Sequence, residues 1–274
     1  MIEWRSRHRS RSITMSGSLT IVGLGPARPE HITREAFELL SAPASRGRRA
    51  YGLAHARELC ASIAPDLEVR SLDYLYQLPG VDRPTAYDDL AGMLVRRAFD
   101  DGFDVLYLVA GSPLFYNDAV LVIRKRCADR GLPLRLVHGV SFVDLVLDRV
   151  FWTGHQGLQV LSAWNLARDG MGLAHDVPAL VVQIGEFSRG GEALDTAQSV
   201  DMLSELRDAL LASLPSEHPV TILYSSGPPE YRSLARSLPL SQLAEGEVPV
   251  YANLWVPARE GPNIERLQAP ESHR

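Results

Sequence analysis

Short apolar runs alternate with helix-like segments along the first half of the chain. The predicted strands are 19–22, 67–72, 105–109 and 134–138. The run at 105–109 is apolar throughout, which is typical of a strand covered on both faces. Between the strands, apolar residues recur every three or four positions, the spacing of an amphipathic helix. The predicted helices are 29–40, 53–63, 85–101, 120–130 and 142–150. Strands separated by helices predict a mostly parallel α/β sheet.

The second half of the chain has longer loops that contain glycine and proline. Its predicted strands are 158–162, 179–183, 219–224 and 248–256, with one long helix at 199–214. A domain boundary is expected near 149–156, which gives α/β domains at 17–149 and 150–260. A cleft between two such domains is a usual place for a small-molecule site.

The two ends of the chain differ from the rest in composition. Residues 1–16, MIEWRSRHRSRSITMS, are rich in Arg and Ser and lack the apolar stretch of a secretory signal. We expect a disordered arm or a start codon upstream of Met15, with a basic arm that binds a polyanion as the alternative. Residues 261–274 are polar, contain two prolines and are expected to be a disordered tail.

Composition excludes several classes of protein. A net charge of -5 argues against non-specific binding of nucleic acid. Cys60 and Cys127 lie far apart and fit neither a disulfide framework nor a metal site, so a reduced cytoplasmic setting is the default. The histidines show no paired ligand spacing, so no metal is expected, and the apolar runs are too short to span a membrane.

The first strand runs into the glycine turn SLTIVGLGPARPEHIT at 18–33. A dinucleotide fingerprint needs a third glycine where Arg28 stands, and a carboxylate some twenty residues later. No carboxylate stands between Glu38 and Glu58, and Pro26 lacks the N–H that would help to bind pyrophosphate. The turn therefore does not predict a nicotinamide oxidoreductase; a structural turn that binds nothing remains the simple alternative.

Three segments that follow predicted strands change this interpretation: VGLGP at 22–26, VAGSPLFY at 109–116 and HGVSFVDLVLDR at 138–149. All three would lie at the carboxyl ends of parallel strands, where open α/β sheets bind ligands. Their order and spacing resembles the tetrapyrrole methylase superfamily of S-adenosylmethionine-dependent (class III) methyltransferases, over about 17–258. Ala27 and Ser112 depart from the usual glycine and Asp or His.

The resemblance implies S-adenosylmethionine, with S-adenosylhomocysteine as the product, folded in the cleft between the two domains. The family holds this cofactor largely through backbone groups, and its methyl group would face the substrate. The residues that the resemblance assigns to the cofactor are Pro26, Ala110, Gly111, Ser112, Leu114, Phe115, Val140, Ser141, Phe142, Gln183 and Ile184.

Segments 72–94, 154–166 and 217–258 are similar to two relatives within the superfamily. One is the methylase-like domain fused to nucleotide pyrophosphohydrolases, and the other is the borosin methyltransferases, which methylate backbone amides of ribosomal peptides. Tyr76, Arg83 and Tyr87 match the borosin pattern of catalytic residues. Arg83 and Tyr87 are one helical turn apart, so both can point into one pocket.

Amide methylation explains these residue types. The amide N–H is a very weak acid, and a tyrosine whose pKa is lowered by a nearby guanidinium could take its proton as phenolate. Arg83 could bind the amide oxygen and favour the imidate form. We therefore expect Tyr76 or Tyr87 as the base and Arg83 as the electrostatic partner. The alternative is that the two tyrosines only pack and Arg83 is solvated.

One position departs from the borosin pattern. A further tyrosine usually stands where this chain has Ala110. Tyr107 lies three residues earlier, and alternation along a strand predicts that it faces away from Ala110. Tyr116 lies within the loop that follows, and neither tyrosine is an obvious replacement.

The expected function is therefore S-adenosylmethionine-dependent methyl transfer (EC 2.1.1.-), with borosin-like α-N-methylation of a ribosomal precursor peptide. The end of the chain, GPNIERLQAPESHR, is neither valine- nor glycine-rich, so that peptide would be a separate chain. The alternatives are methylation of a tetrapyrrole or other small molecule, and a non-catalytic domain that senses S-adenosylmethionine or another ligand. The resemblance also implies a homodimer, with contacts from helix 85–101 and from Phe151 and Trp152; no nucleic-acid or membrane partner is expected.

Overall fold

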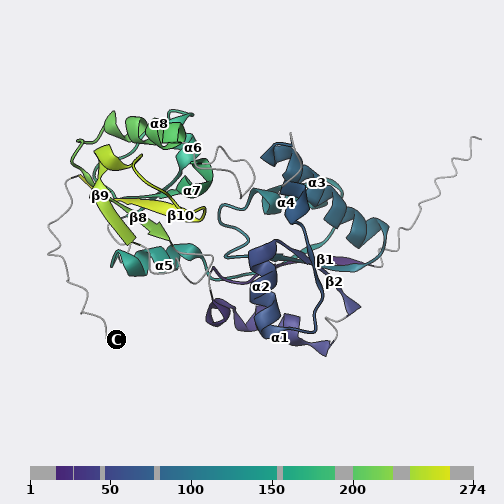
Figure 1. The fold of residues 1–274 in the computed structure, drawn as a ribbon. Helices are drawn as coiled ribbons and strands as arrows, with labels where there is room; N and C mark the ends of the chain where they lie inside the picture. Colours follow the sequence, from purple (N-terminus) through teal and green to yellow (C-terminus); the bar gives the residue numbers. More distant parts are fainter. Residues whose placement is uncertain are drawn as a thin grey trace, which may run out of the picture.

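The computed structural model describes residues 17–26, 28–43, 47–76, 81–152, 157–188, 200–224 and 235–259. They form two five-stranded sheets, each covered by helices (Figure 1). The arm at 1–16 and the tail at 261–274, both expected to be disordered, lie outside the described residues. No helix within the described ranges is long and apolar enough to cross a membrane.

The first sheet is parallel throughout, as the sequence predicts, with the strand order β3-β2-β4-β1-β5. Its strands are β1 (Ser18–Gly23), β2 (Arg49–Gly52), β3 (Val69–Ser71), β4 (Asp104–Val109) and β5 (Leu134–Val137). Strands β4 and β1 lie at the centre, and their last five residues are buried. The carboxyl ends of these two strands therefore carry loops that are held on a rigid core.

Helices cover both faces of this sheet (Figure 1). Alternate residues of β4 face opposite sides: Leu106 and Leu108 pack with α1 (Arg34–Ser41) and α2 (Ala54–Ile63), and Val105 and Val109 pack with α3 (Arg83–Val95) and α4 (Asp118–Asp129). Because both faces of the sheet are covered by helices, side chains on both sides of β4 are apolar. This explains why the whole run is hydrophobic.

Two predictions for the first sheet need correction. The predicted helix at 29–40 is divided, because Thr33 caps the N-terminus of α1 by accepting a hydrogen bond from the Ala36 N–H at 3.3 Å. A short 3₁₀ turn, Pro29–His31, comes before it. Strand β2 was not predicted, since its sequence RAYG carries no β-branched residue.

The predicted helix at 85–101 is α3 followed by a π-helical segment, Arg96–Asp100. Leu90, Leu94 and Phe99 are buried against the sheet, so these apolar side chains are used inside the subunit rather than at a dimer contact. Phe151, the other expected contact, is 58% exposed. The homodimer stays a prediction.

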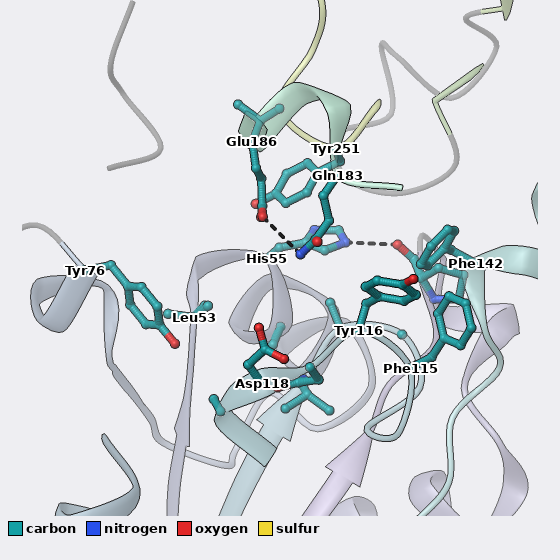
Figure 2. Close-up of a pocket in the computed structure, with 18 of the residues that line it drawn as sticks. Leu53, His55, Tyr76, Phe115, Tyr116, Asp118, Phe142, Gln183, Glu186 and Tyr251 are labelled. Atoms are coloured by element: carbon teal, nitrogen blue, oxygen red, sulfur yellow. Dashed lines mark hydrogen bonds between the residues drawn. The ribbon is translucent and has the colours of Figure 1, made fainter. Parts of the chain in front are cut away.

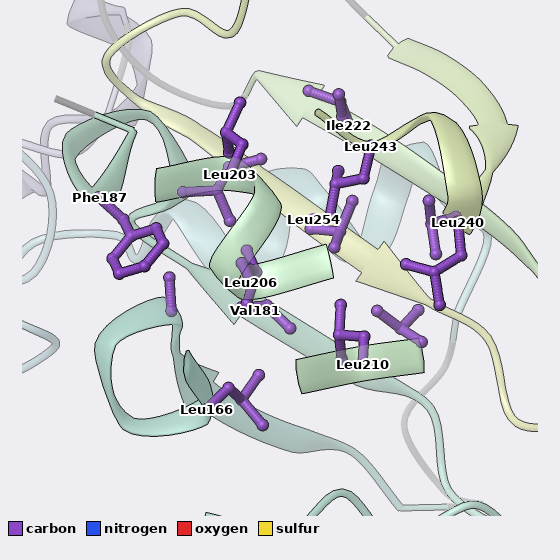
Figure 3. Packing of buried hydrophobic residues seen from close by; sticks show 14 of the residues in the cluster. Leu166, Val181, Phe187, Leu203, Leu206, Leu210, Ile222, Leu240, Leu243 and Leu254 are labelled. Atoms are coloured by element: carbon purple, nitrogen blue, oxygen red, sulfur yellow. The ribbon is translucent and has the colours of Figure 1, made fainter. Parts of the chain in front are cut away.

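The second sheet is mixed, with the order β6-β7-β10-β8-β9. Its strands are β6 (Gln159–Ser162), β7 (Ala179–Val182), β8 (Pro219–Tyr224), β9 (Ala235–Pro239) and β10 (Ala252–Val256). Strands β6 and β7 are parallel and the remaining pairs are antiparallel. One face carries α6 (Ala163–Ala167), α7 (Ile184–Phe187) and α8 (Val200–Leu211), where leucines of α8 pack on β7 and β10 (Figure 3).

The other face of the second sheet is covered by α5 (Phe142–Arg149), which follows β5 of the first sheet. Val146 of α5 packs with Leu180, Val182 and Trp255 of the second sheet. The predicted domain boundary near 149–156 comes after α5 in sequence, whereas this packing joins α5 to the second sheet. The loop between β5 and α5 therefore crosses from one sheet to the other.

Candidate functional site

The three strand-end loops meet at glycines. A Cβ added to Gly23 would lie 2.6 Å from the Gly139 nitrogen and 2.8 Å from the Gly111 oxygen, closer than any side chain tolerates. The Gly111 N–H donates to the Gly25 oxygen at 2.8 Å, and both residues have positive φ, at 77° and 76°. The glycine turn of β1 is thus built to lie against the loop after β4, because only glycine permits this approach.

A cavity of about 240 Å³ lies beside these loops, between the two sheets. The first sheet contributes residues from the ends of β1 and β4, from α2, and from the starts of α3 and α4. The second sheet contributes the β7–α7 corner and residues 250–253 at the start of β10 (Figure 2). The position agrees with the general rule that open α/β sheets bind ligands at the carboxyl ends of their strands.

Several residues expected to bind the cofactor line this cavity: Pro26, Ala110, Gly111, Phe115, Phe142 and Gln183. Others expected there do not line it: Ser112, Leu114, Val140, Ser141 and Ile184. Three of them have other contacts in the structure. The Ser112 hydroxyl accepts from the Leu114 N–H and the Ser141 hydroxyl caps α5, both at 3.3 Å, while Ile184 is fully buried in the core of the second sheet.

All three predicted catalytic residues line the cavity and lie together. Arg83 Nη1 donates to the Tyr87 hydroxyl at 3.4 Å, and the rings of Tyr76 and Tyr87 meet edge to face at 6.0 Å. The Arg83 guanidinium carbon lies 6.0 Å from the centre of the Tyr76 ring. Tyr76 ends the 3₁₀ turn Asp73–Tyr76, and Arg83 and Tyr87 stand on the first turns of α3, whose N-terminus is capped by Asp82.

A carboxylate that sequence reasoning missed completes this cluster. Glu186 of α7 lies across the cavity from α3, with its Oε2 3.6 Å from Arg83 Nη1 and 3.4 Å from Gln183 Nε2. The two charged side chains are only 24% and 18% exposed. Burial raises the pKa of Glu186, and Arg83 partly opposes that rise. The ion pair therefore links the two sheets at the cavity.

The tyrosines of this cluster do not carry the predicted phenolate. Burial raises the pKa of Tyr76 above its usual value, and Arg83 offsets only part of the rise. Burial raises the pKa of Tyr87 in the same way, again with Arg83 as the opposing influence. The expectation of a lowered tyrosine pKa is wrong, because loss of hydration outweighs the nearby guanidinium. Both phenols are neutral near pH 7.

Tyr107 also belongs to the site. It is 3% exposed, packs in the same cluster as Tyr76 and Tyr87, and lines the cavity together with Ala110. Leu108 and Val109, which lie between them, line the cavity as well, so the prediction that Tyr107 and Ala110 face opposite ways stays a prediction.

Gln183 is held in an uncommon backbone conformation at the start of α7. Its φ is 65°, in the left-handed region that non-glycine residues rarely adopt. Its N–H donates at 3.4 Å to the Oδ1 of Asn253, a buried residue of β10. Strained residues of this kind gather at functional sites, where the surrounding structure holds them.

Two further residues of the cavity wall had no signal in the sequence. His55 Nε2 lies 3.2 Å from the Pro26 oxygen, and its ring is 6.3 Å from that of Tyr251. His55 is on α2 and Tyr251 comes just before β10, so they connect the two sheets beside the glycine turn. His55 was judged one of several scattered histidines, and spacing alone could not reveal this contact.

The loop after β4 brings aromatic side chains to the opposite side of the cavity (Figure 2). Phe115 meets Phe142 at 5.4 Å between ring centres and Tyr116 at 5.0 Å. The Tyr116 hydroxyl donates to the Val160 oxygen of β6 at 3.3 Å, and Tyr116 has a φ of 48°. The cavity is thus apolar and aromatic on one side and carries a charged pair on the other.

Comparison with known proteins identifies the class. The profile of the family described as Tetrapyrrole (Corrin/Porphyrin) Methylases matches residues 18–239. The chain belongs to this family, as its strand-end loops predict. Over 214 residues it is 22% identical to the protein YabN of Bacillus subtilis, described as uncharacterized; the match covers 78% of this chain and 39% of that relative. The chain thus spans about two fifths of that relative's length.

Solved structures share the fold. The uroporphyrin-III C-methyltransferase of Thermus thermophilus superposes with a TM-score of 0.61 and 18% identity over 89% of this chain and 93% of that one. The same enzyme complexed with S-adenosyl homocysteine gives 0.55 and 19%, over 88% and 92%. The precorrin-6Y methylase of Archaeoglobus fulgidus gives 0.58 and 17%, over 89% and 100%. The predicted fold of two α/β domains is confirmed.

Proposed function

We propose that this chain is an S-adenosylmethionine-dependent methyltransferase that methylates backbone amides of a separate peptide. The observation that carries the proposal is the cavity at the strand ends of the first sheet, into which Tyr76, Arg83 and Tyr87 converge. Membership of the tetrapyrrole methylase family supports the methyl-transfer part of it. The match of Tyr76, Arg83 and Tyr87 to the borosin pattern motivates the peptide part.

The residues of the cavity are suited to S-adenosylmethionine. Gly111 lines the cavity and a Cβ there would meet nothing within 4 Å, so a ligand can approach the main chain closely at this loop. Aromatic and aliphatic side chains such as Leu53 and Phe142 suit the adenine ring. The cofactor supplies an electrophilic methyl group on a sulfonium, and the chain binds and orients both partners.

The charges in the cavity favour an amide over a porphyrin-like macrocycle. Among the described residues that line it, Arg83 is the only Arg or Lys, while Asp118 and Glu186 are carboxylates. Substrates that carry several carboxylates need an excess of cations around them. A peptide amide is neutral, and one guanidinium that binds its oxygen is enough to polarise it. The neutral phenols of Tyr76 and Tyr87 can hold that peptide by hydrogen bonds.

The test is methyl transfer to defined substrates. Purified protein would be incubated with S-adenosylmethionine and either the peptide encoded by a neighbouring gene or uroporphyrinogen III, and products would be analysed by mass spectrometry. A methyl increment on a backbone amide supports the proposal, and one on the tetrapyrrole alone contradicts the peptide assignment. Calorimetric binding of S-adenosylhomocysteine without conversion of any substrate favours a sensing domain. No binding at millimolar concentration contradicts the whole proposal.

A further inference from the structure

Glu186 is held rigidly at the wall of the cavity by a single helical turn. Its neighbours in α7, Ile184, Gly185 and Phe187, are buried in the second domain. A Cβ on Gly185 would collide with the backbone oxygens of Pro249 and Val250, so this turn lies directly against the segment before β10. In Figure 2 the Glu186 side chain descends from this turn toward the cavity, beside Gln183. The fold therefore fixes the backbone from which the Glu186 side chain reaches the cavity.

A carboxylate at this position lowers the stability of the fold, so stability does not explain why it is there. Removing a charged group from water is unfavourable, and one ion pair at 3.6 Å offsets that cost only in part. The rise in the Glu186 pKa with burial has the same origin. A half-buried, perturbed carboxylate that lines a cavity is a candidate for proton transfer.

We propose that Glu186 accepts the proton from the nitrogen nucleophile when the methyl group is transferred, an inference that rests on the proposed function. In this step the C–N bond forms while the bond between the methyl carbon and sulfur breaks, and its electron pair remains on sulfur. The N–H proton passes to the Glu186 carboxylate. The products are a methylated nitrogen, a neutral thioether and a protonated Glu186.

The other groups of the cavity are less suited to this role. Tyr76, Tyr87 and Tyr107 are neutral phenols, because burial raises the pKa of each of them. Asp118 lies in the first turn of α4, on the first domain, whereas Glu186 comes from the second domain. Glu186 Oε2 lies 3.6 Å from the guanidinium that we assign to the substrate oxygen.

The ion pair also suggests how substrate entry prepares the base. In the described structure Arg83 contacts both the Tyr87 hydroxyl and Glu186. An amide oxygen that binds Arg83 would compete with Glu186 for the guanidinium. Weaker pairing raises the proton affinity of the carboxylate. The substrate would thus increase the basicity of the group that takes its proton.

The first experiment measures charge at the reacting centre without turnover. The probes are S-adenosylhomocysteine, which is neutral at sulfur, and sinefungin, which carries an ammonium group where the transferred methyl would be. We expect the wild-type protein to bind sinefungin about tenfold more tightly in calorimetry, because a nearby carboxylate attracts the ammonium. Glu186→Gln should reduce that preference to within about twofold and leave S-adenosylhomocysteine affinity unchanged.

Matched variants make this result specific. Asp118→Asn removes the other carboxylate of the cavity and should keep the preference, and Glu186→Asp should retain most of it. A preference that survives in Glu186→Gln, or that is absent in the wild type, overturns the inference while binding of S-adenosylhomocysteine preserves the proposed function. If the wild type binds neither probe, both fail.

The second experiment tests proton transfer with the peptide that the enzyme accepts. Glu186→Gln should lower kcat by about 100-fold or more with KM nearly unchanged, the usual effect of losing a general base. The Glu186→Asp variant should recover part of the rate. If the sinefungin preference disappears but kcat does not fall, Glu186 provides charge only and the proton-acceptor role is overturned.

Discussion

The two domains divide the candidate site between regular and irregular structure. The first sheet is parallel, and it supplies loops at the ends of the neighbouring, well-packed strands β1 and β4 together with the first turns of α3 and α4. The second sheet is mixed, and it supplies a four-residue helix and the segment before β10. The difference teaches that the strand ends of the first domain form the edge at which a ligand can bind. The second domain adds particular reactive side chains, such as Glu186, from short elements with strained backbone.

The largest effect is expected where the two domains meet, at Arg83. Arg83→Ala and Tyr76→Phe should each reduce methyl transfer by about 100-fold or more, because they remove groups that bind the reacting amide. Calorimetry should find S-adenosylhomocysteine affinity within about twofold of wild type. Unchanged turnover in both variants would remove these residues from the catalytic assignment.

The next effect concerns the loops of the first sheet. Gly139→Ala should lower the free energy of unfolding by about 1–3 kcal/mol, because its Cβ would lie 2.7 Å from the Gly23 carbonyl carbon. It should also weaken binding of S-adenosylhomocysteine. Gly47→Ala is the matched control: an added Cβ meets nothing within 4 Å, so both quantities should stay near wild type. Urea unfolding and calorimetry measure the two effects, and equal behaviour of the two variants would contradict the packed-loop interpretation.

A smaller effect reports on burial in the second domain. Burial raises the pKa of Tyr251 to about 12 from the model-compound value of 10.0. An unfolded chain loses this proton first, so the folded state binds more protons between these values, and the free energy of unfolding falls as pH rises from 10 to 12. Tyr251→Phe should reduce that fall by about 1 kcal/mol, measured by urea unfolding at both ends of the window. An identical pH dependence in the variant would mean that Tyr251 is solvated.

The smallest effect is expected from loss of the hydrogen bond between the loop after β4 and strand β6. Tyr116→Phe should cost about 1 kcal/mol of unfolding free energy through loss of the bond to the Val160 oxygen. Tyr74→Phe, at a tyrosine that is 52% exposed, is the control and should change little. If the two variants are equally stable, the bond does not hold the domains together in solution.

The regular domain was predicted well where burial leaves a clear pattern in the sequence. Strand β4 is buried on both faces, and α3 and α4 each bury one face against the sheet. The apolar run of β4 and the helical spacing of apolar residues in α3 and α4 are therefore visible in the sequence. Strand β2 was not predicted because it has four residues, of which Tyr51 alone is typical of strands, and its contacts within the sheet decide its conformation.

The candidate site was predicted unevenly for the same reason. Tyr76, Arg83 and Tyr87 could be found because their spacing matches a known pattern, and the structure brings them together. Glu186 could not be found, since a polar residue after the strand ALVVQ gives no hint that the next turn points it across the cavity. The raised tyrosine pKa values were missed because burial is a tertiary property that residue spacing does not encode.

The most direct test is a crystal structure of the protein with S-adenosylhomocysteine. The account predicts that the nucleoside lies in the cavity beside Gly111 and Phe142, with its sulfur directed toward Arg83 and Glu186. A ligand bound elsewhere, or a sulfur that faces away from this pair, would contradict it.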